Sequence, residues 1–321
     1  MTRDVRRPAT SAAVAARAGV SRTTVSYILN GKSGVSFRDE TRESVLRAVN
    51  ELGYRPNPAA RSLADGSGPV VFVASSEPLN ELTSAAFGPI AQAFARHGIL
   101  STLIQASPDA RRAVDDLVAL RPRAVAFVFP PGEHVERWLA SEGIRVIAMP
   151  FSLASLSVGE AQVSYLVAQG HDRLAIADVE HADHFGVLGR AREVATACAE
   201  RGLPQPPIAG VNRNGDGARE LVEQWTRDGV TAVCAYNDEI ALAVLHGVRE
   251  AGLRCPDDLA VIGCDDLTVA SVAAPPLTTV GFEVTTGLDD LVAEMLAQLG
   301  IGPAPDTLAA PIARVIVRQS A

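Results

Sequence analysis

The chain of 321 residues is long enough for two or three domains, and with 47% hydrophobic and 21% charged residues it can bury sizeable cores. This composition excludes a chain that is disordered overall. Its four cysteines have no paired spacing, which excludes a disulfide framework and a clustered zinc site. The N-terminus lacks a signal-like apolar core, and no apolar run approaches the roughly 20 residues that cross a bilayer. We therefore expect a cytoplasmic protein without a membrane partner.

The net charge of −8 is unevenly distributed along the chain. Residues 1–66 hold 11 Lys and Arg against 6 Asp and Glu, a balance of +5, which leaves −13 for the remainder. A basic head on an acidic body is typical of a nucleic-acid-binding module joined to a second domain. Over so short a segment, the imbalance by itself is equally compatible with chance.

The basic head is predicted to form short helices. They are expected over residues 12–18, 22–29 and 36–52. Thr10 or Ser11 can cap the first helix, and Gly19 ends it because glycine tolerates the left-handed conformation of a tight turn. Ser21 can cap the second helix. The third helix is expected to bury Val45, Leu46 and Val49.

Two short helices joined by a glycine turn form a helix-turn-helix, whose second helix lies in the major groove of DNA. The second helix here is rich in Ser and Thr, which are mediocre helix formers but allow a close approach to a polar surface. The side chains expected to be exposed on it are Ser21, Arg22, Thr23, Thr24 and Ser26. Arg22 can donate two hydrogen bonds to a guanine edge. A small helical bundle with a solvated Ser/Thr face is the alternative.

Residues 57–66 predict a short hinge helix, since Asn57 is a good N-cap, Pro58 suits a first helical turn and Gly66 suits an end. A helix this short is unstable alone in water, so it should fold only against a partner. Without its neighbours, the segment would be taken for an ordinary proline-rich linker.

From Pro69 onward, apolar strands alternate with helical stretches, which predicts two successive β/α domains with parallel sheets. Strands are expected at 70–74, 99–104, 124–129, 146–149, 174–177, 232–235 and 259–263. Helices are expected at 85–97, 110–120, 135–142, 191–201, 217–227 and 239–251. Ligands of such folds bind beyond the carboxyl ends of the strands, so a small-molecule site is expected between the two lobes.

Short motifs that are weak individually occur in a specific order along the chain. They are AGVS at 18–21, TVS at 24–26, LGYRPN at 52–57, ARSL at 60–63, GH at 170–171, NDEIA at 237–241, GCDD at 263–266 and PLTT at 276–279. With these motifs, the chain resembles the LacI/GalR family of bacterial transcription regulators over nearly its whole length.

The resemblance implies an α/β protein with an N-terminal helix-turn-helix head and a two-lobed, periplasmic-binding-protein-like core of parallel β/α sheets. The implied domains are a DNA-binding head over 1–56, a hinge helix over 57–66 and an effector-binding and dimerisation core over 67–321. The family binds palindromic double-stranded operator DNA as a homodimer, and a small molecule in the cleft changes the DNA affinity. A repressor that is not an enzyme is favoured, with a sugar or a nucleoside as the suspected effector.

The resemblance also implies site residues. The DNA-binding positions are Ser21, Arg22, Thr23, Ser26, Tyr27, Asn30, Tyr54, Asn57, Ala60 and Leu63. The effector-binding candidates are Arg190, Asn237 and Asp265. The guanidinium of Arg190 offers a rigid fork of donors, and Asp265 can accept hydrogen bonds from hydroxyls or amines. A surface arginine and a turn aspartate at a strand end are the alternatives, and no metal or cofactor is indicated.

The chain departs from the family pattern at several points. Tyr27 stands where an arginine is common, and the segment 75–80 lacks the usual aromatic pair. The segment 150–159 replaces a longer stretch that contains an aspartate, and Glu193-Val194 replaces a usual Gly-Phe. A cleft that stacks sugars on aromatic rings is therefore poorly supported, and the DNA-binding half is better specified than the effector-binding half.

Two other classes of protein compete with a regulator. A transport-type solute-binding protein would explain the two lobes but not the basic head. An enzyme on a doubly wound fold is disfavoured because the chain has no phosphate-binding loop with its lysine, no His-Glu-x-x-His helix and no Gly-x-Ser-x-Gly elbow.

Overall fold

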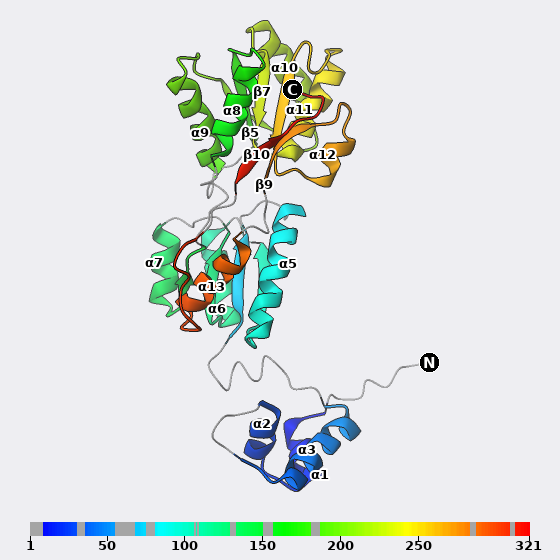
Figure 1. Cartoon of the computed structure of the whole chain (residues 1–321), viewed down its shortest axis with the longest axis vertical. Helices are drawn as coiled ribbons and strands as arrows, with labels where there is room; N and C mark the ends of the chain where they lie inside the picture. Colours follow the sequence, from blue (N-terminus) through cyan, green and yellow to red (C-terminus); the bar gives the residue numbers. More distant parts are fainter. Residues whose placement is uncertain are drawn as a thin grey trace, which may run out of the picture. The chain divides into compact units, whose positions relative to one another are not determined.

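The computed structural model describes residues 9–30, 36–54, 68–74, 81–105, 107, 109–128, 133–149, 157–180, 187–282, 287–308 and 312–321. The chain divides into two compact units, the head (Met1–Gly68) and the body (Pro69–Ala321) (Figure 1). The predicted hinge helix over 57–66 lies outside the described residues. None of the described helices is long and apolar enough to cross a membrane.

The head contains three described helices, as predicted, although the third begins at Asp39 and not at Ser36. They are α1 (Ser11–Ala18), α2 (Arg22–Asn30) and α3 (Asp39–Leu52). All three contribute to a small apolar core made of Val14, Ala15, Val25, Ile28, Val45 and Ala48. The helix-turn-helix therefore has its own hydrophobic core.

Local signals set the ends of α1. The side-chain oxygen of Thr10 accepts a hydrogen bond from the backbone N–H of Ala13 at 3.2 Å, so Thr10 is the cap. Gly19 ends the helix with a φ of 70°, in the left-handed region that favours glycine.

The prediction that Leu46 is buried is wrong, because its side chain is 44% exposed. Leu46 follows the buried Val45 by one residue, which rotates it about 100° away from the apolar stripe of α3.

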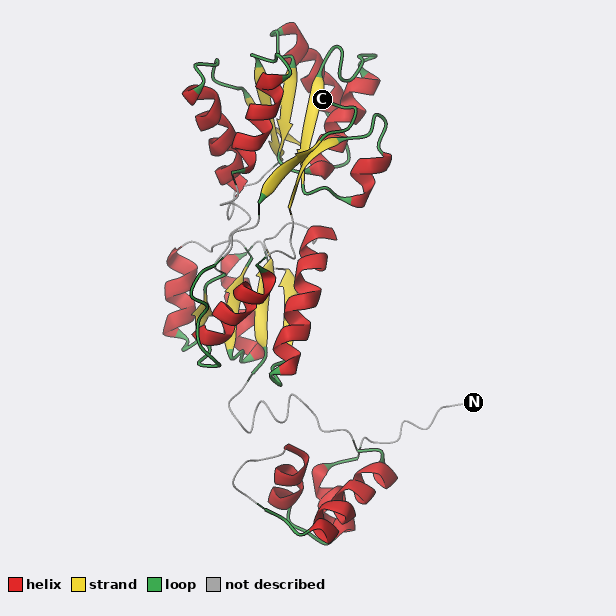
Figure 2. Ribbon diagram, viewed as in Figure 1, coloured by secondary structure: helices red, strands yellow, loops and turns green. Residues whose placement is uncertain are grey.

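The first lobe of the body is built on a parallel four-stranded sheet of order β2-β1-β3-β4 (Figure 2). Its strands are β1 (Val70–Ala74), β2 (Ser101–Gln105), β3 (Ala124–Phe127) and β4 (Val146–Ile147). Its helices are α5 (Glu81–Arg96), α6 (Ala110–Leu120) and α7 (Glu133–Ser141).

A late helix, α13 (Leu288–Gln298), belongs to this first lobe. Its residues Leu291, Val292 and Met295 pack with Phe72 of β1 and Phe94 of α5. The prediction of two strictly successive domains is therefore wrong in this respect. The amphipathic face of α13 completes the cover of one side of the first sheet, while α6 and α7 cover the other.

The second lobe is built on a six-stranded sheet of order β10-β9-β8-β7-β5-β6. Its strands are β5 (Leu174–Val179), β6 (Ile208–Val211), β7 (Ala232–Ala235), β8 (Ala260–Cys264), β9 (Thr278–Phe282) and β10 (Ala313–Ile316). Its helices are α8 (Val158–Ala168), α9 (Val187–Glu200), α10 (Ala218–Arg227), α11 (Asp238–Glu250) and α12 (Thr268–Val272). Sequence periodicity did not predict β6, β9 or β10. The sheet is parallel as predicted except for β10, which pairs antiparallel with β9 at the edge.

Side chains of the second sheet alternate between its two faces. Leu174, Ile176, Cys234, Ile262 and Cys264 pack on the face covered by α8 and α9. Ala175, Ala177, Val233, Ala235 and Val261 pack on the face covered by α10 and α11. Since alternation has a period of two, the residue that follows each strand can be assigned to a face. The carboxyl ends of β5, β7 and β8 all meet at one edge of this sheet, where the candidate effector residues lie.

Candidate nucleic-acid interface and effector site

The start of α2 presents a polar surface to solvent. Ser21, Arg22, Thr23 and Ser26 are exposed, and Tyr27 is half-buried. Arg22 has no hydrogen bond or ion pair with any other described residue. By contrast Arg17, on α1, is paired with Glu51 of α3 at 2.6 Å.

Ser21 has a structural role as well. Its side-chain oxygen accepts a hydrogen bond from the backbone N–H of Thr24 at 3.0 Å, which caps α2 as predicted. The two hydroxyl groups are also hydrogen-bonded to each other at 2.9 Å. Thr24 is half-buried, so the prediction that it is exposed is wrong.

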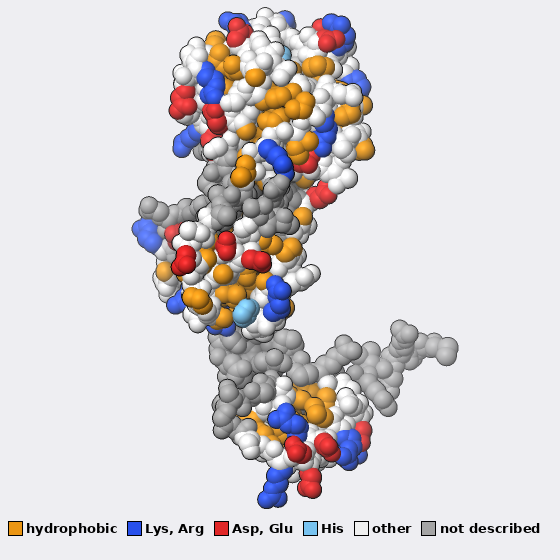
Figure 3. Space-filling view, in the orientation of Figure 1, with side chains coloured by type: hydrophobic (Ala, Val, Ile, Leu, Met, Phe, Trp, Pro, Cys, Tyr) orange, Lys and Arg blue, Asp and Glu red, His pale blue; other side chains and the backbone are white. Residues whose placement is uncertain are grey.

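The other predicted DNA-binding positions fall in different places. Tyr54 follows α3 and packs against the apolar core of the head. Asn30 is the last residue of α2, and its side chain is not among those described. Asn57, Ala60 and Leu63 lie outside the described residues. On the face shown in Figure 3 the head carries acidic as well as basic side chains, so its positive charge is not gathered into one patch there.

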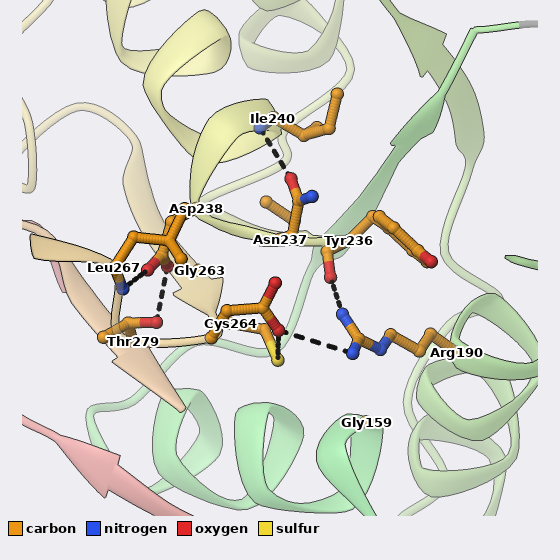
Figure 4. A network of polar contacts seen from close by, with 12 residues as sticks. Gly159, Arg190, Tyr236, Asn237, Asp238, Ile240, Gly263, Cys264, Leu267 and Thr279 are labelled. Carbon is orange, nitrogen blue, oxygen red and sulfur yellow. Dashed lines mark hydrogen bonds and ion pairs between the residues drawn. The ribbon is translucent and has the colours of Figure 1, made fainter. Parts of the chain in front are cut away.

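In the body, the structure brings two of the three effector candidates into contact. Nη2 of Arg190, on α9, lies 3.5 Å from Oδ1 of Asp265, which follows β8 (Figure 4). The side chains are only 9% and 4% exposed, so the alternative of a surface arginine is wrong. Arg190 also donates a hydrogen bond to the carbonyl oxygen of Tyr236, and its guanidinium lies 4.7 Å from the centre of the Tyr236 ring.

The turn after β8 has an uncommon backbone. Asp265 and Asp266 both have positive φ, 105° and 49°, a region that residues other than glycine seldom occupy. Their carboxylates are held by different arginines, since Asp266 pairs with Arg318 at 2.6 Å while Asp265 pairs with Arg190. The Sγ–H of Cys264 also donates to Asp265, at 3.3 Å. Non-glycine residues persist in such conformations when the surrounding contacts fix them, often at functional sites.

The third candidate, Asn237, follows β7 and caps α11. Its Oδ1 accepts the backbone N–H of Ile240 at 2.9 Å, and the residue is 3% exposed. The next residue, Asp238, was not predicted as a site residue. Its carboxylate accepts hydrogen bonds from the hydroxyl of Thr279 and from the N–H of Leu267, the latter at 2.7 Å. Burial above all raises the pKa of Asp238 to about 7.

The sequence analysis also missed Asp178, near the end of β5. It is buried, at 8% exposed, and burial raises the pKa of its carboxyl group, while the charge of Arg190 opposes that shift. Only the strand-end position of an acidic residue could have drawn attention to it. Within the described parts of the chain, no three His, Cys, Asp or Glu side chains gather as a set of metal ligands.

Helices α8 and α9 meet directly beside this site (Figure 4). A Cβ atom on Gly159 of α8 would lie 2.5 Å from the backbone nitrogen of Val194, so only glycine fits there. The carboxylate of Glu193 accepts the backbone N–H of Gly159 at 3.2 Å. Gln162, one turn further along α8, donates hydrogen bonds to the carbonyl oxygens of Ala235 and Gly263 at 2.9 and 3.0 Å. Helix α8 thus supports the ends of β7 and β8, which lead into the candidate effector residues.

A helix-turn-helix head joined to a body with two β/α lobes defines a class of DNA-binding proteins with a ligand-binding domain. Residues 12–57 match the description "Bacterial regulatory proteins, lacI family", and residues 163–321 match "Periplasmic binding protein-like domain". The HTH-type transcriptional regulator CelR of Thermobifida fusca is 32% identical over 321 residues, which cover 86% of this chain and 87% of that protein. MalR of Streptomyces coelicolor is 29% identical over 335 residues, covering 96% and 95%.

Among solved structures, the lac repressor dimer bound to operator and the anti-inducer ONPF shares this fold. Its TM-score is 0.75, at 24% identity over 98% of this chain and 99% of that one. The chain belongs to the lacI family of bacterial regulatory proteins, and it is a DNA-binding regulator of transcription.

Proposed function

We propose that the protein is a repressor that binds a palindromic operator as a homodimer, and that a small-molecule effector between the lobes controls its DNA affinity. The solved lac repressor dimer on operator DNA supports this assembly for a chain of the same fold. A transcription regulator works beside the chromosome, so we place it in the bacterial cytoplasm. No catalytic role is proposed, because the family is one of regulators.

The observation that carries the DNA-binding proposal is the exposed start of α2. Ser21, Thr23 and Ser26 are short enough to let the helix enter a major groove, and Arg22 is unpaired within the described chain. An arginine held at the N-terminal end of a recognition helix can donate two hydrogen bonds to guanine. We propose that Arg22 and Thr23 read bases, and that Ser21 and Tyr54 position the head on phosphates.

The test is selection of bound duplexes from a random DNA pool, followed by affinity measurements at several salt concentrations. Arg22→Ala should relax the preference at one base pair at a cost of about 1–3 kcal/mol. Arg17→Ala is the matched control, because it removes the same charge from the head but on α1. The control should weaken all duplexes alike. A selected palindrome would support dimeric binding, and unchanged base preference in Arg22→Ala would refute the docking.

For the effector, we propose contacts with Arg190, Asn237 and Asp265 and a sugar or nucleoside as the ligand. Two related structures carry sugars, the CelR complex with cellobiose and a LacI-family regulator of Lactobacillus casei with bound sucrose. A thermal-shift screen of metabolites, followed by calorimetry, tests the proposal. The Arg190→Met/Asp265→Leu double variant should lose binding, and Asp266→Asn should keep it.

We also propose the domain limits 1–56, 57–66 and 67–321, with the hinge helix carrying Leu63 into the minor groove. An inserted apolar side chain unstacks a base step and kinks the duplex. Leu63→Ala should then reduce operator bending and affinity without affecting dimerisation. Gel mobility on circularly permuted fragments measures the bend, and a variant that bends its site as strongly as the parent would rule out the wedge.

A further inference from the structure

The buried charges of the second lobe are unbalanced. Among the described residues, the buried charged side chains are Asp178, Asp238, Asp265 and Arg190, so three carboxyl groups share one guanidinium. Asp238 is satisfied by the N–H and O–H donors of Leu267 and Thr279. Asp178 and Asp265 remain, with Arg190 as their one buried counter-charge.

Asp178 lies on the same face of the sheet as Arg190. In β5 the residues Leu174 and Ile176 pack toward α8 and α9, and Asp178 continues this alternation. The pairing of Ala177 with Ala235 places Asp178 level with Tyr236, whose carbonyl accepts a hydrogen bond from Arg190. The charge of Arg190 is also close enough to act on the pKa of Asp178.

The carboxylate of Asp178 has few partners among the described residues. Oδ1 accepts the N–H of the adjacent Val179 at 2.8 Å, and no described residue donates to the other carboxylate oxygen. The residue is only 8% exposed. A buried carboxylate is unfavourable unless hydrogen-bond donors and an opposite charge compensate it. Asp265 already pairs with this guanidinium, so among the described residues two buried carboxylates share one buried positive charge, and a cationic ligand would compensate the second.

We propose that Asp178, beside the Arg190–Asp265 pair, binds an ammonium group of the effector, and that the effector is a hydroxyl-bearing amine such as an amino sugar. This inference rests on the effector site proposed above. An ammonium group donates charge-assisted hydrogen bonds to carboxylates and corrects the excess negative charge. A phosphorylated sugar would add negative charge beside two carboxylates. A neutral sugar would leave the charge of Asp178 unpaired.

The probe is tris(hydroxymethyl)aminomethane, a small ammonium ion with three hydroxyl groups. Its control ligand is pentaerythritol, a neutral molecule with the same three hydroxymethyl groups on a central carbon and a fourth in place of the amine. Saturation-transfer NMR at neutral pH and low salt, on the full-length protein, measures the binding of each. We expect saturable binding of the amine and at least roughly tenfold weaker binding of pentaerythritol, since a hydrogen bond to a charged group is worth about 1.5–3 kcal/mol.

Two variants complete the test. Asp178→Asn keeps the shape of the side chain and removes its charge, so it should weaken binding of the amine roughly tenfold and leave pentaerythritol unaffected. Asp266→Asn removes a neighbouring carboxylate that Arg318 already neutralises, and it should leave amine binding unchanged. Equal binding of the two ligands, no saturable binding of the amine, or unaltered binding in Asp178→Asn would each overturn the proposal. Operator binding in the same preparations is a separate readout, so a failure here leaves the regulator function standing.

Discussion

Replacing Asp265 by asparagine should destabilise the second lobe, because it leaves Arg190 buried without its carboxylate. The two charged groups are 3.5 Å apart and at most 9% exposed. Breaking a buried pair from one side costs about 3–5 kcal/mol. The Tyr236 carbonyl and ring still contact the guanidinium in the variant, so we expect the low end, about 3 kcal/mol.

The adjacent carboxylate provides the control. Asp266 is paired with Arg318 at 2.6 Å, but these side chains are 33% and 19% exposed, so Asp266→Asn should cost no more than about 1 kcal/mol. Urea unfolding in a Trp138→Phe background measures the stability of both variants. The fluorescence then reports on the second lobe, because the remaining tryptophan, Trp225, is buried there. A midpoint shift for Asp265→Asn no larger than that for Asp266→Asn would show that the pair does not hold the site together.

Three further outcomes follow from single contacts. Burial raises the pKa of Asp238 from 3.8 to about 7, so between these values the folded lobe retains a proton that the unfolded chain releases. The free energy of unfolding should therefore fall as pH rises from about 4 to 7, by at most about 1.4 kcal/mol per pH unit. In the Asp238→Asn variant, the free energy of unfolding measured by denaturation should depend less on pH across this range. Gly159→Ala should cost about 1–3 kcal/mol in thermal unfolding, although alanine is the better helix former, since its Cβ meets the backbone of α9. Ser21→Ala should lower the stability of the head by about 0.5–2 kcal/mol in circular-dichroism melts, and Thr23→Ala, which removes an exposed hydroxyl, should not.

The head could be predicted closely because its signals are local. A hydroxyl cap at Thr10, a glycine at position 19 and a second cap at Ser21 fix the helix-turn-helix within a few residues of chain. The sequence analysis expects Leu46 in the core, but helical geometry turns its side chain away from the apolar stripe of α3. Thr24 was placed among exposed hydroxyls, although its side chain bonds to the cap residue.

The body could be predicted only where strand and helix alternate without interruption. Arg190 and Asp265 are 75 residues apart in sequence, and the family resemblance, not periodicity, placed them in one site. The position of α13 in the first lobe depends on its packing against one apolar face of the first sheet. This packing joins segments far apart in sequence, so no local pattern predicts it. The edge strand β10 depends in the same way on the free edge of β9.

The contact between α8 and α9 holds together the two helices that support the candidate effector site. The two helices approach closely because Gly159 has no side chain at the point where α8 meets the backbone of Glu193 and Val194. The side chain of Glu193 binds the first turn of α8, whose cap residue Ser157 makes no side-chain capping bond. A carboxylate at the N-terminal end of a helix is favoured by the helix dipole. Since Arg190 lies one helical turn before Glu193, the same contact that fixes α8 also fixes the helix that carries the guanidinium of the candidate effector site.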